Sequence, residues 1–146
     1  MVFKSAFFTS TDHFMYMTNS MYGILQTKNS IGEGSKLKLT KQASGGYTIT
    51  SKKWPDYYVY AAKNRYLYGT KSPADSESNF YFQCFEFEFL ANGYYSITRK
   101  YKSKDCPEYS VYTDTINKYA KAKSPKAATC DKDQLSRCWV LYDYDN

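Results

Sequence analysis

Two glutamates and one histidine are the residues whose types and spacing come closest to acid–base chemistry. Glu86 and Glu88 alternate with phenylalanines in "CFEFEF", so a strand would hold them roughly 7 Å apart on one face, a separation at which paired carboxylates can hydrolyse glycosides. His13 follows Asp12, but the sequence sets no serine or cysteine nucleophile against it. Glutamates are ordinary on the outer face of a strand, and a histidine is ordinary in a surface turn. We therefore expect a protein that is not an enzyme. The alternating phenylalanines are assigned to the core: Phe85, Phe87 and Phe89.

The glycine-rich stretch and the cysteines give no sign of a nucleotide or a metal ion. "IGEGSK" lacks the spacing of a phosphate-binding loop. A zinc site needs closely spaced pairs of cysteine or histidine, and the cysteine spacing offers no such pair. We therefore expect no cofactor and no metal. The four cysteines are Cys84, Cys106, Cys130 and Cys138.

These cysteines also bear on the compartment. Four of them are compatible with two disulfides in three possible pairings, and buried free thiols are the alternative. Disulfides persist in oxidising compartments, so we expect a secreted protein. The opening "MVFKSAFFTSTDHF" lacks the apolar core of a signal peptide, which fits either a leader already removed or a cytosolic chain. No apolar run of about 18 residues occurs, so we expect no transmembrane segment.

The stretch "WPDYYVY" at 54–60 is the first candidate for a ligand surface. Alternation along a strand would turn Val59 inward and its neighbouring rings outward. An exposed ring beside a carboxylate suits a sugar, which offers an apolar face for stacking and hydroxyl groups for hydrogen bonding. The alternative is structural, with Trp54 closing the mouth of a barrel or a hairpin cap. The candidate ligand-binding residues of this stretch are Trp54, Asp56, Tyr58 and Tyr60.

A second candidate surface is basic. The chain has 20 lysines and arginines against 14 acidic residues, a net charge of +6, which favours anionic partners. Basic residues gather at 36–41, 99–104 and 117–126, and the last segment would form a cationic platform or, alternatively, a merely solvated face. Nucleic acid is disfavoured, because disulfide-rich proteins outside cells seldom meet it. The platform lysines are Lys118, Lys121, Lys123 and Lys126.

The elements that must position these residues are short β-strands arranged in repeats. "GYTIT" at 46–50 matches "YYSIT" at 94–98, and the segment at 27–39 matches that at 70–82 with a shift of 43 residues. "FMYM", "YVY" and "SVY" occupy corresponding places. No segment sustains a helical stripe, and short strands at regular spacing indicate an all-β fold. The three units of four strands are approximately 1–44, 45–91 and 92–146.

Three four-strand repeats in one domain over 1–146 resemble the β-trefoil, a six-stranded barrel capped by three hairpins. We therefore predict an all-β fold of the β-trefoil class, whose closed barrel hides strand edges. The superfamily includes ricin-type lectins, fibroblast growth factors and Kunitz-type inhibitors. Ricin-type lectins mark each repeat with Gln-x-Trp, and here only the third corresponding tripeptide keeps the tryptophan. The tripeptides assigned to that place are Ser35-Lys36-Leu37, Ser78-Asn79-Phe80 and Arg137-Cys138-Trp139.

The third repeat has two enlarged loops, each with a cysteine, so a Cys106–Cys130 disulfide would join them and stiffen the lysine platform. Fibroblast growth factors place their heparin-binding lysines in the third repeat, so the resemblance implies a sulfated glycan as ligand. We predict a secreted, non-catalytic, lectin-like carbohydrate-binding module, for anionic or sulfated glycans among others. The alternative is a protein-binding trefoil, either a protease inhibitor that presents "SKDCPEY" at 103–109 or a cytokine-like or toxin-like receptor ligand.

Overall fold

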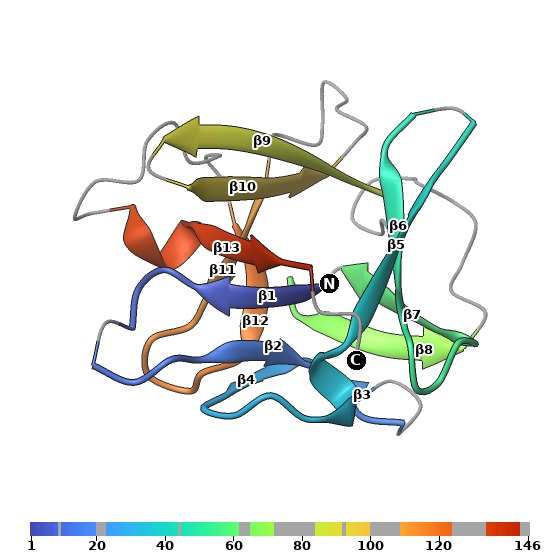
Figure 1. Cartoon of the computed structure of the whole chain (residues 1–146), viewed down its shortest axis with the longest axis horizontal. Coiled ribbons are helices and arrows are strands. Elements are labelled where there is room, and N and C mark those ends of the chain that lie inside the picture. The colour runs from blue at the N-terminus through green and yellow to red at the C-terminus, as the bar shows by residue number, and fades with distance from the viewer. Residues whose placement is uncertain are drawn as a thin grey trace.

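The computed structural model describes residues 1–8, 10–19, 23–43, 45–61, 65–71, 84–91, 93–99, 109–123 and 134–143. Their regular structure is β-sheet with two single-turn 3-10 helices (Figure 1). The elements are β1 (Val2–Ser5), β2 (Phe14–Tyr16), β3 (Gly23–Ile24), β4 (Gln26–Lys28), η1 (Glu33–Ser35), β5 (Leu37–Lys41), β6 (Tyr47–Ser51), β7 (Tyr57–Ala61), β8 (Leu67–Lys71), β9 (Phe85–Ala91), β10 (Tyr94–Arg99), β11 (Ser110–Thr113), β12 (Ala120–Lys123), η2 (Leu135–Arg137) and β13 (Trp139–Tyr142).

Six of the strands form a closed barrel. The antiparallel order runs from β1 through β13, β10, β9 and β6 to β5. The Leu37 amide then donates a 2.9 Å hydrogen bond to the Met1 carbonyl and returns the ring to the start of β1. The Met1 amino group donates a 2.7 Å bond to the Leu37 carbonyl in return, so β1 and β5 are joined at this point.

Three hairpins cover one end of this barrel: β2 with β4, β7 with β8, and β11 with β12. They also pair with one another, through Gly23 and Gly69, Gln26 and Tyr119, and Tyr66 and Lys121. A six-stranded barrel with three mutually contacting hairpins is the β-trefoil arrangement. The predicted fold class is therefore confirmed.

The three repeats keep the same register. In each repeat the first barrel strand pairs with the hairpin strand that follows it. The paired residues are Lys4 with Phe14, Thr50 with Tyr58, and Thr98 with Ser110. The match between "GYTIT" and "YYSIT" is thus correct, because these segments are β6 and β10. Alternation sends equivalent side chains into the barrel as two layers of three, each at most 1% exposed. The layers are Phe3, Ile49 and Ile97, and Leu37, Phe85 and Trp139.

The gap-free match between 27–39 and 70–82 misplaced the closing strand of the second repeat. β4 ends at Lys28 and β5 begins at Leu37, whereas β8 ends at Lys71 and β9 begins only at Phe85. Because the connection is longer in the second repeat, Phe85 is the residue equivalent to Leu37. Leu37 pairs with Ser51 of β6, and Phe85 pairs with Arg99 of β10. The tripeptide of the second repeat is therefore Gln83-Cys84-Phe85, which has the glutamine, and not Ser78-Asn79-Phe80.

β9 is only partly in the core. Phe85 is fully buried and Phe87 packs partly buried against the core, as predicted. Phe89, in contrast, is 58% exposed. It lies near the turn at Gly93, and its ring makes an edge-to-face contact with that of Tyr95. The alternating glutamates are exposed, as expected for the outer face. Among the described residues, no helix is long and apolar enough to cross a membrane.

Candidate functional site

The turn between β6 and β7 carries Trp54 and Asp56 on a hydrogen-bonded backbone. The Trp54 amide donates a 3.0 Å hydrogen bond to the Ser51 hydroxyl oxygen, and the Tyr57 amide donates a 2.9 Å bond to the Trp54 carbonyl. Trp54 is half-buried, while Asp56 is exposed. The turn thus presents part of an indole and a carboxylate to solvent from a backbone held at both ends.

β7 follows the predicted alternation at two of its three central positions. Val59 is fully buried, and Tyr58 is half-buried, so part of its ring reaches the surface. The outward placement of Tyr60 is wrong, because this ring is 7% exposed. β7 lies between β6 and β8, and Tyr60 faces Tyr68 across the strand pair, so its flank is covered by neighbours in the sheet. Tyr60 is therefore removed from the candidate ligand surface.

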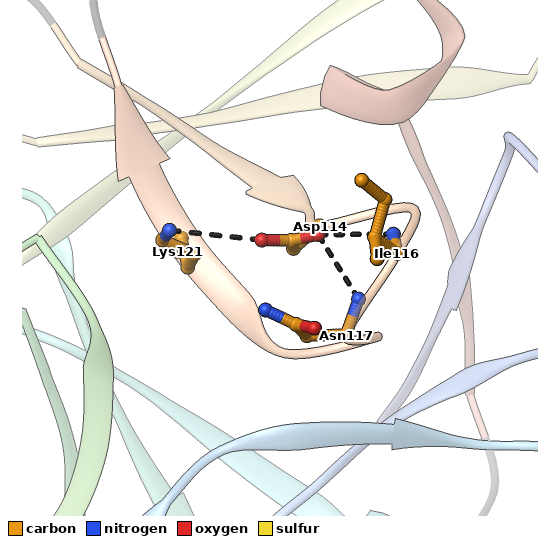
Figure 2. Close-up of polar contacts among 4 residues, drawn as sticks. All are labelled: Asp114, Ile116, Asn117 and Lys121. Carbon is orange, nitrogen blue, oxygen red and sulfur yellow. Dashed lines mark hydrogen bonds and ion pairs between the residues drawn. The ribbon is translucent and has the colours of Figure 1, made fainter.

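The turn between β11 and β12 is organised by one carboxylate, Asp114 (Figure 2). One of its oxygens accepts hydrogen bonds from the amides of Ile116 at 2.9 Å and Asn117 at 3.1 Å. The Asp114 carbonyl also accepts a 2.7 Å bond from the amide of Lys118. The bond from Asn117 is the main cause that lowers the pKa of Asp114 below its usual value, with the Ile116 bond and Lys121 acting in the same direction.

Lys121, predicted as part of a cationic platform, is engaged inside the protein. Its ammonium lies 3.6 Å from the second Asp114 oxygen and 4.6 Å from the centre of the Tyr66 ring. Burial opposes its charged form, but Tyr112, Tyr66 and Asp114 outweigh that effect and raise the pKa of Lys121 above 10.5. A positive charge already matched by a carboxylate and a ring contributes less to an external anion site than the sequence suggested.

The other platform lysines divide between the described and the remaining parts of the chain. Lys118 is exposed and has a φ of 62°, in the left-handed region that a tight turn uses. Its carbonyl accepts bonds from the amide and the hydroxyl of Thr27, at 2.7 and 3.0 Å, so the third repeat is joined to the first. Lys123 is the last residue of β12, and Lys126 lies outside the described residues.

Basic side chains lie over several tyrosine rings. Cation and ring centre are 3.9 Å apart in the closest case, Lys28 over Tyr16. Such contacts occupy the ring face that a sugar would otherwise stack on. Part of the tyrosine content is thus explained by internal contacts, which leaves Trp54 and Tyr58 as the better candidates. The remaining contacts join Lys4 with Tyr142, Arg65 with Tyr109, and Lys71 with Tyr57, each at 5.6 Å.

Cys106 and Cys130, the predicted disulfide pair, both lie outside the described residues. The inhibitor-like segment at 103–109 also lies outside them up to residue 108, and its last residue, Tyr109, is buried. In the described part of the chain, Cys138 is disulfide-bonded. Within the described part of the chain, no group of three or more histidine, cysteine, aspartate or glutamate side chains could hold a metal ion.

The sequence predicts His13 in a surface turn, and this prediction is wrong, because His13 is buried and only 7% exposed. Its ring lies 4.0 Å from that of Phe8, and its Nδ1 is buried without a hydrogen-bond partner among the described residues. Burial is the main cause that lowers the pKa of His13 below 6.5, and Lys118 adds to the lowering while Asp12 opposes it. The Asp12 carboxylate is itself exposed and lies 3.5 Å from the Lys4 ammonium.

The repeat register explains this burial. Phe14, Tyr58 and Ser110 occupy equivalent positions in the three repeats. The residues that precede them are His13, Tyr57 and Tyr109, so His13 takes the place of a tyrosine ring in the other two repeats. An acidic residue precedes each ring, in "DHF", "DYY" and "EYS". This small motif was the signal in the sequence that could have assigned His13 to the packed interior.

Comparisons with known proteins support the fold. No family model and no curated protein sequence matches the chain. Among solved structures, it is similar to a GlcNAcα1-4Gal-releasing endo-β-galactosidase from Clostridium perfringens, with a TM-score of 0.70 and 13% identity. That match covers 99% of this chain and 32% of the galactosidase. A designed threefold symmetric protein, ThreeFoil, matches with a TM-score of 0.68 and 12% identity over 98% of this chain and 97% of its own.

These two similarities concern the fold of the chain. At such low identity they show the fold alone, and they agree with the barrel and hairpins described above. The chain has the β-trefoil fold, and it spans about a third of the galactosidase that it resembles.

Proposed function

We propose that this chain is a non-catalytic carbohydrate-binding module whose ligand docks on the turn between β6 and β7. The observation that carries the proposal is that the half-buried Trp54 and the exposed Asp56 both lie on one hydrogen-bonded turn. The indole offers a face to the C–H groups of a pyranose, and the carboxylate accepts hydrogen bonds from hydroxyl groups. Because the turn is already fixed, little conformational entropy would be lost on binding.

Two further points support a glycan as ligand. The galactosidase with the similar fold is named for the release of GlcNAcα1-4Gal, which makes that disaccharide a reasonable first probe. The corrected tripeptide Gln83-Cys84-Phe85 also restores one glutamine of the ricin-type pattern. The ring of Tyr58, half-buried on the strand that follows the turn, would extend the surface.

The test is a glycan array at low and at high salt, followed by calorimetric titration with the strongest array ligand and with GlcNAcα1-4Gal. We expect Trp54→Ala to weaken binding about tenfold or more, because one stacking face is lost, and Asp56→Asn to weaken it less. Phe89→Ala removes a ring on another strand that is 58% exposed and should leave affinity unchanged. Absence of any array signal at both salt concentrations would contradict the proposal.

The same array tests whether the ligand is anionic or sulfated. Lys118 is exposed beside the β11–β12 turn, whereas Lys121 is paired internally. Sulfated ligands that bind only at low salt and require Lys118 would favour the basic surface, since exposed charges are screened by salt. Neutral ligands that bind at both salt concentrations and require Trp54 favour the β6–β7 turn.

Secretion belongs to the same proposal. Cys138 is disulfide-bonded, so peptide mapping of the unreduced protein should find it in a linked pair of peptides and identify its partner. Four alkylatable thiols in the native protein would remove the case for an oxidising compartment.

One observation favours a protein as partner instead. Ile116 is 86% exposed at the tip of the ordered turn that Asp114 fixes. A preorganised aliphatic side chain is suited to a pocket on another protein. Ile116→Ala should leave glycan affinity unchanged, and a measurable inhibition of trypsin that this substitution abolishes would move the assignment to the protein-binding class.

A further inference from the structure

The loop between β1 and β2 takes the same place in the first repeat as the β6–β7 turn takes in the second. The strand pairings described above align the two repeats residue by residue. Ser5, the last residue of β1, therefore corresponds to Ser51, the last residue of β6. Asp12, two residues before the first paired residue of its hairpin, corresponds to Asp56. Both loops thus have an exposed carboxylate at the same position.

The backbone also leaves the barrel in the same way in both repeats. The Phe7 amide donates a 3.3 Å hydrogen bond to the Ser5 hydroxyl oxygen, as the Trp54 amide does to the Ser51 hydroxyl oxygen. In each case this bond fixes an aromatic residue shortly after the end of the strand. Phe7 is 40% exposed, so part of its ring reaches solvent. The β1–β2 loop therefore repeats the combination of an aromatic ring and a carboxylate on one hydrogen-bonded loop.

Ring and backbone contacts join the two ends of the β1–β2 loop. The Phe8 ring lies 5.2 Å from that of Phe7, at an angle of 89°, and 4.0 Å from that of His13. His13 directly follows Asp12, and its carbonyl accepts a 2.8 Å hydrogen bond from the Ser5 amide. The loop is thus held before any ligand arrives, which lowers the conformational entropy that binding would cost.

A neighbouring cation completes the set of polar groups. The Lys4 ammonium lies 3.5 Å from the Asp12 carboxylate, and 57% of the Asp12 side chain is exposed. Lys4 also lies 5.6 Å from the centre of the Tyr142 ring. The hydrogen bond with Tyr142 is the main cause that raises the pKa of Lys4 above 10.5, and Asp12 acts in the same direction. The ammonium supplies hydrogen-bond donors and the carboxylate supplies acceptors, and a sugar hydroxyl can pair with both.

We propose that the β1–β2 loop is a second carbohydrate site and that the chain is bivalent. The Phe7 ring stacks on the C–H face of a neutral pyranose, while Asp12 and Lys4 bind its hydroxyl groups. This inference rests on the proposed function, which it extends from one site to two. The corresponding segment of the third repeat, at 100–108, lies outside the described residues.

The positions of the two loops determine what bivalence would do. In Figure 1 the β1–β2 loop lies at the left of the molecule and the β6–β7 turn at the lower right. Sites that far apart, on opposite sides, suit two separate glycans better than the two ends of one disaccharide. One chain would therefore join two glycans, and a surface or polymer with many glycans would bind more tightly than a single glycan does.

The experiment is NMR mapping of the isotope-labelled full chain with GlcNAcα1-4Gal, and separately with galactose and N-acetylglucosamine. We expect two groups of amide signals to move, one around Phe7 and one around Trp54, each with its own dissociation constant. Phe7→Ala should weaken binding at the first group about tenfold or more and leave the second unchanged. Trp54→Ala should do the reverse, and Phe89→Ala, the control, should change neither.

Bivalence has a separate readout. A soluble polymer that carries many copies of GlcNAcα1-4Gal should form a precipitate with the unaltered chain and none with either single-site variant. Shifts confined to the β6–β7 turn, without a precipitate, would overturn the second site and leave the proposed function intact. Shifts at neither loop would overturn both. If Phe7→Ala does not fold, Asp12→Asn, which keeps every ring, tests the same site and should weaken the β1–β2 group alone.

Discussion

At the scale of single residues, Asp114 shows how one side chain can organise a turn. Its carboxylate accepts two amide hydrogen bonds and pairs with Lys121 (Figure 2). The same side chain therefore orders a turn and neutralises a lysine that would otherwise be available to an anionic ligand. Aspartate suits this place because its short side chain can reach backbone amides two and three residues ahead.

Substitutions at Asp114 separate these two roles. Asp114→Ala removes the acceptor and the charge and should lower the free energy of unfolding by about 1–2 kcal/mol. Asp114→Asn keeps an acceptor oxygen and loses only the ion pair with Lys121, at a cost of about 0.5 kcal/mol. Urea unfolding measures both, with the exposed Asp143→Ala as the control that should cost nothing measurable.

The pH dependence of the same variants follows from the lowered pKa of Asp114. A carboxyl with a lowered folded-state pKa stabilises the protein above its unfolded pKa and loses that contribution as the pH falls through the folded value. The difference in stability between the unaltered protein and Asp114→Asn should therefore be full near neutral pH and shrink below about pH 4. A difference that grew on acidification would contradict this assignment.

At the scale of elements, η1 shows how closely the connections pack against the hairpins. The Met17 amide donates a 2.9 Å hydrogen bond to the Gly34 carbonyl, which holds η1 against the end of β2. A Cβ atom at Gly34 would overlap the Met17 carbonyl oxygen and meet the Tyr16 ring at 2.8 Å. Only glycine allows this approach, and β5 begins directly after it.

Gly34→Ala should therefore destabilise the protein by about 2–3 kcal/mol, because the obstacle is backbone and cannot rotate away. Gly32→Ala is the matched control in the same segment, since its nearest neighbour would be a Tyr16 ring atom at an ordinary 3.5 Å. Thermal and urea unfolding of the two variants give the comparison. Equal stability would show that η1 moves aside without cost.

The sequence predicts the positions of some strands and not of others. The repeat pattern located β6 and β10 correctly, because strand alternation and the Tyr-x-Ile-Thr match are local signals. The start of β9 depended on a long connection that has no counterpart in the first repeat. The lowered pKa of His13 depends on burial and on Lys118, which is distant in sequence. Contacts between repeats, such as Lys121 over Tyr66, leave no periodic pattern to detect.

At the scale of the whole molecule, each repeat supplies one residue to every core layer. Ile49 and Ile97 occupy equivalent positions in β6 and β10 and are at most 1% exposed. A layer shared among three repeats cannot be lost in one repeat alone. The three repeats should consequently unfold in one cooperative transition.

Truncations in this layer test that cooperativity. Ile49→Ala and Ile97→Ala should each cost about 2–5 kcal/mol, as expected for buried aliphatic side chains. Near- and far-ultraviolet circular dichroism should report one coincident transition in each variant. Leu39→Ala, at a partly buried position on β5, should cost less. Separate transitions for the two signals would mean that the repeats fold independently.

The two tryptophans differ in burial, so their intrinsic fluorescence can report on two different parts of the protein. Trp139 is fully buried, with its indole N–H donating a 2.9 Å hydrogen bond to the Val111 carbonyl, so its emission reports on the barrel. Trp54 is half-buried at the candidate site, so its emission reports on contact with a ligand. A Trp54→Phe variant would isolate the barrel signal, and subtracting its spectrum would isolate the surface signal, without any added dye.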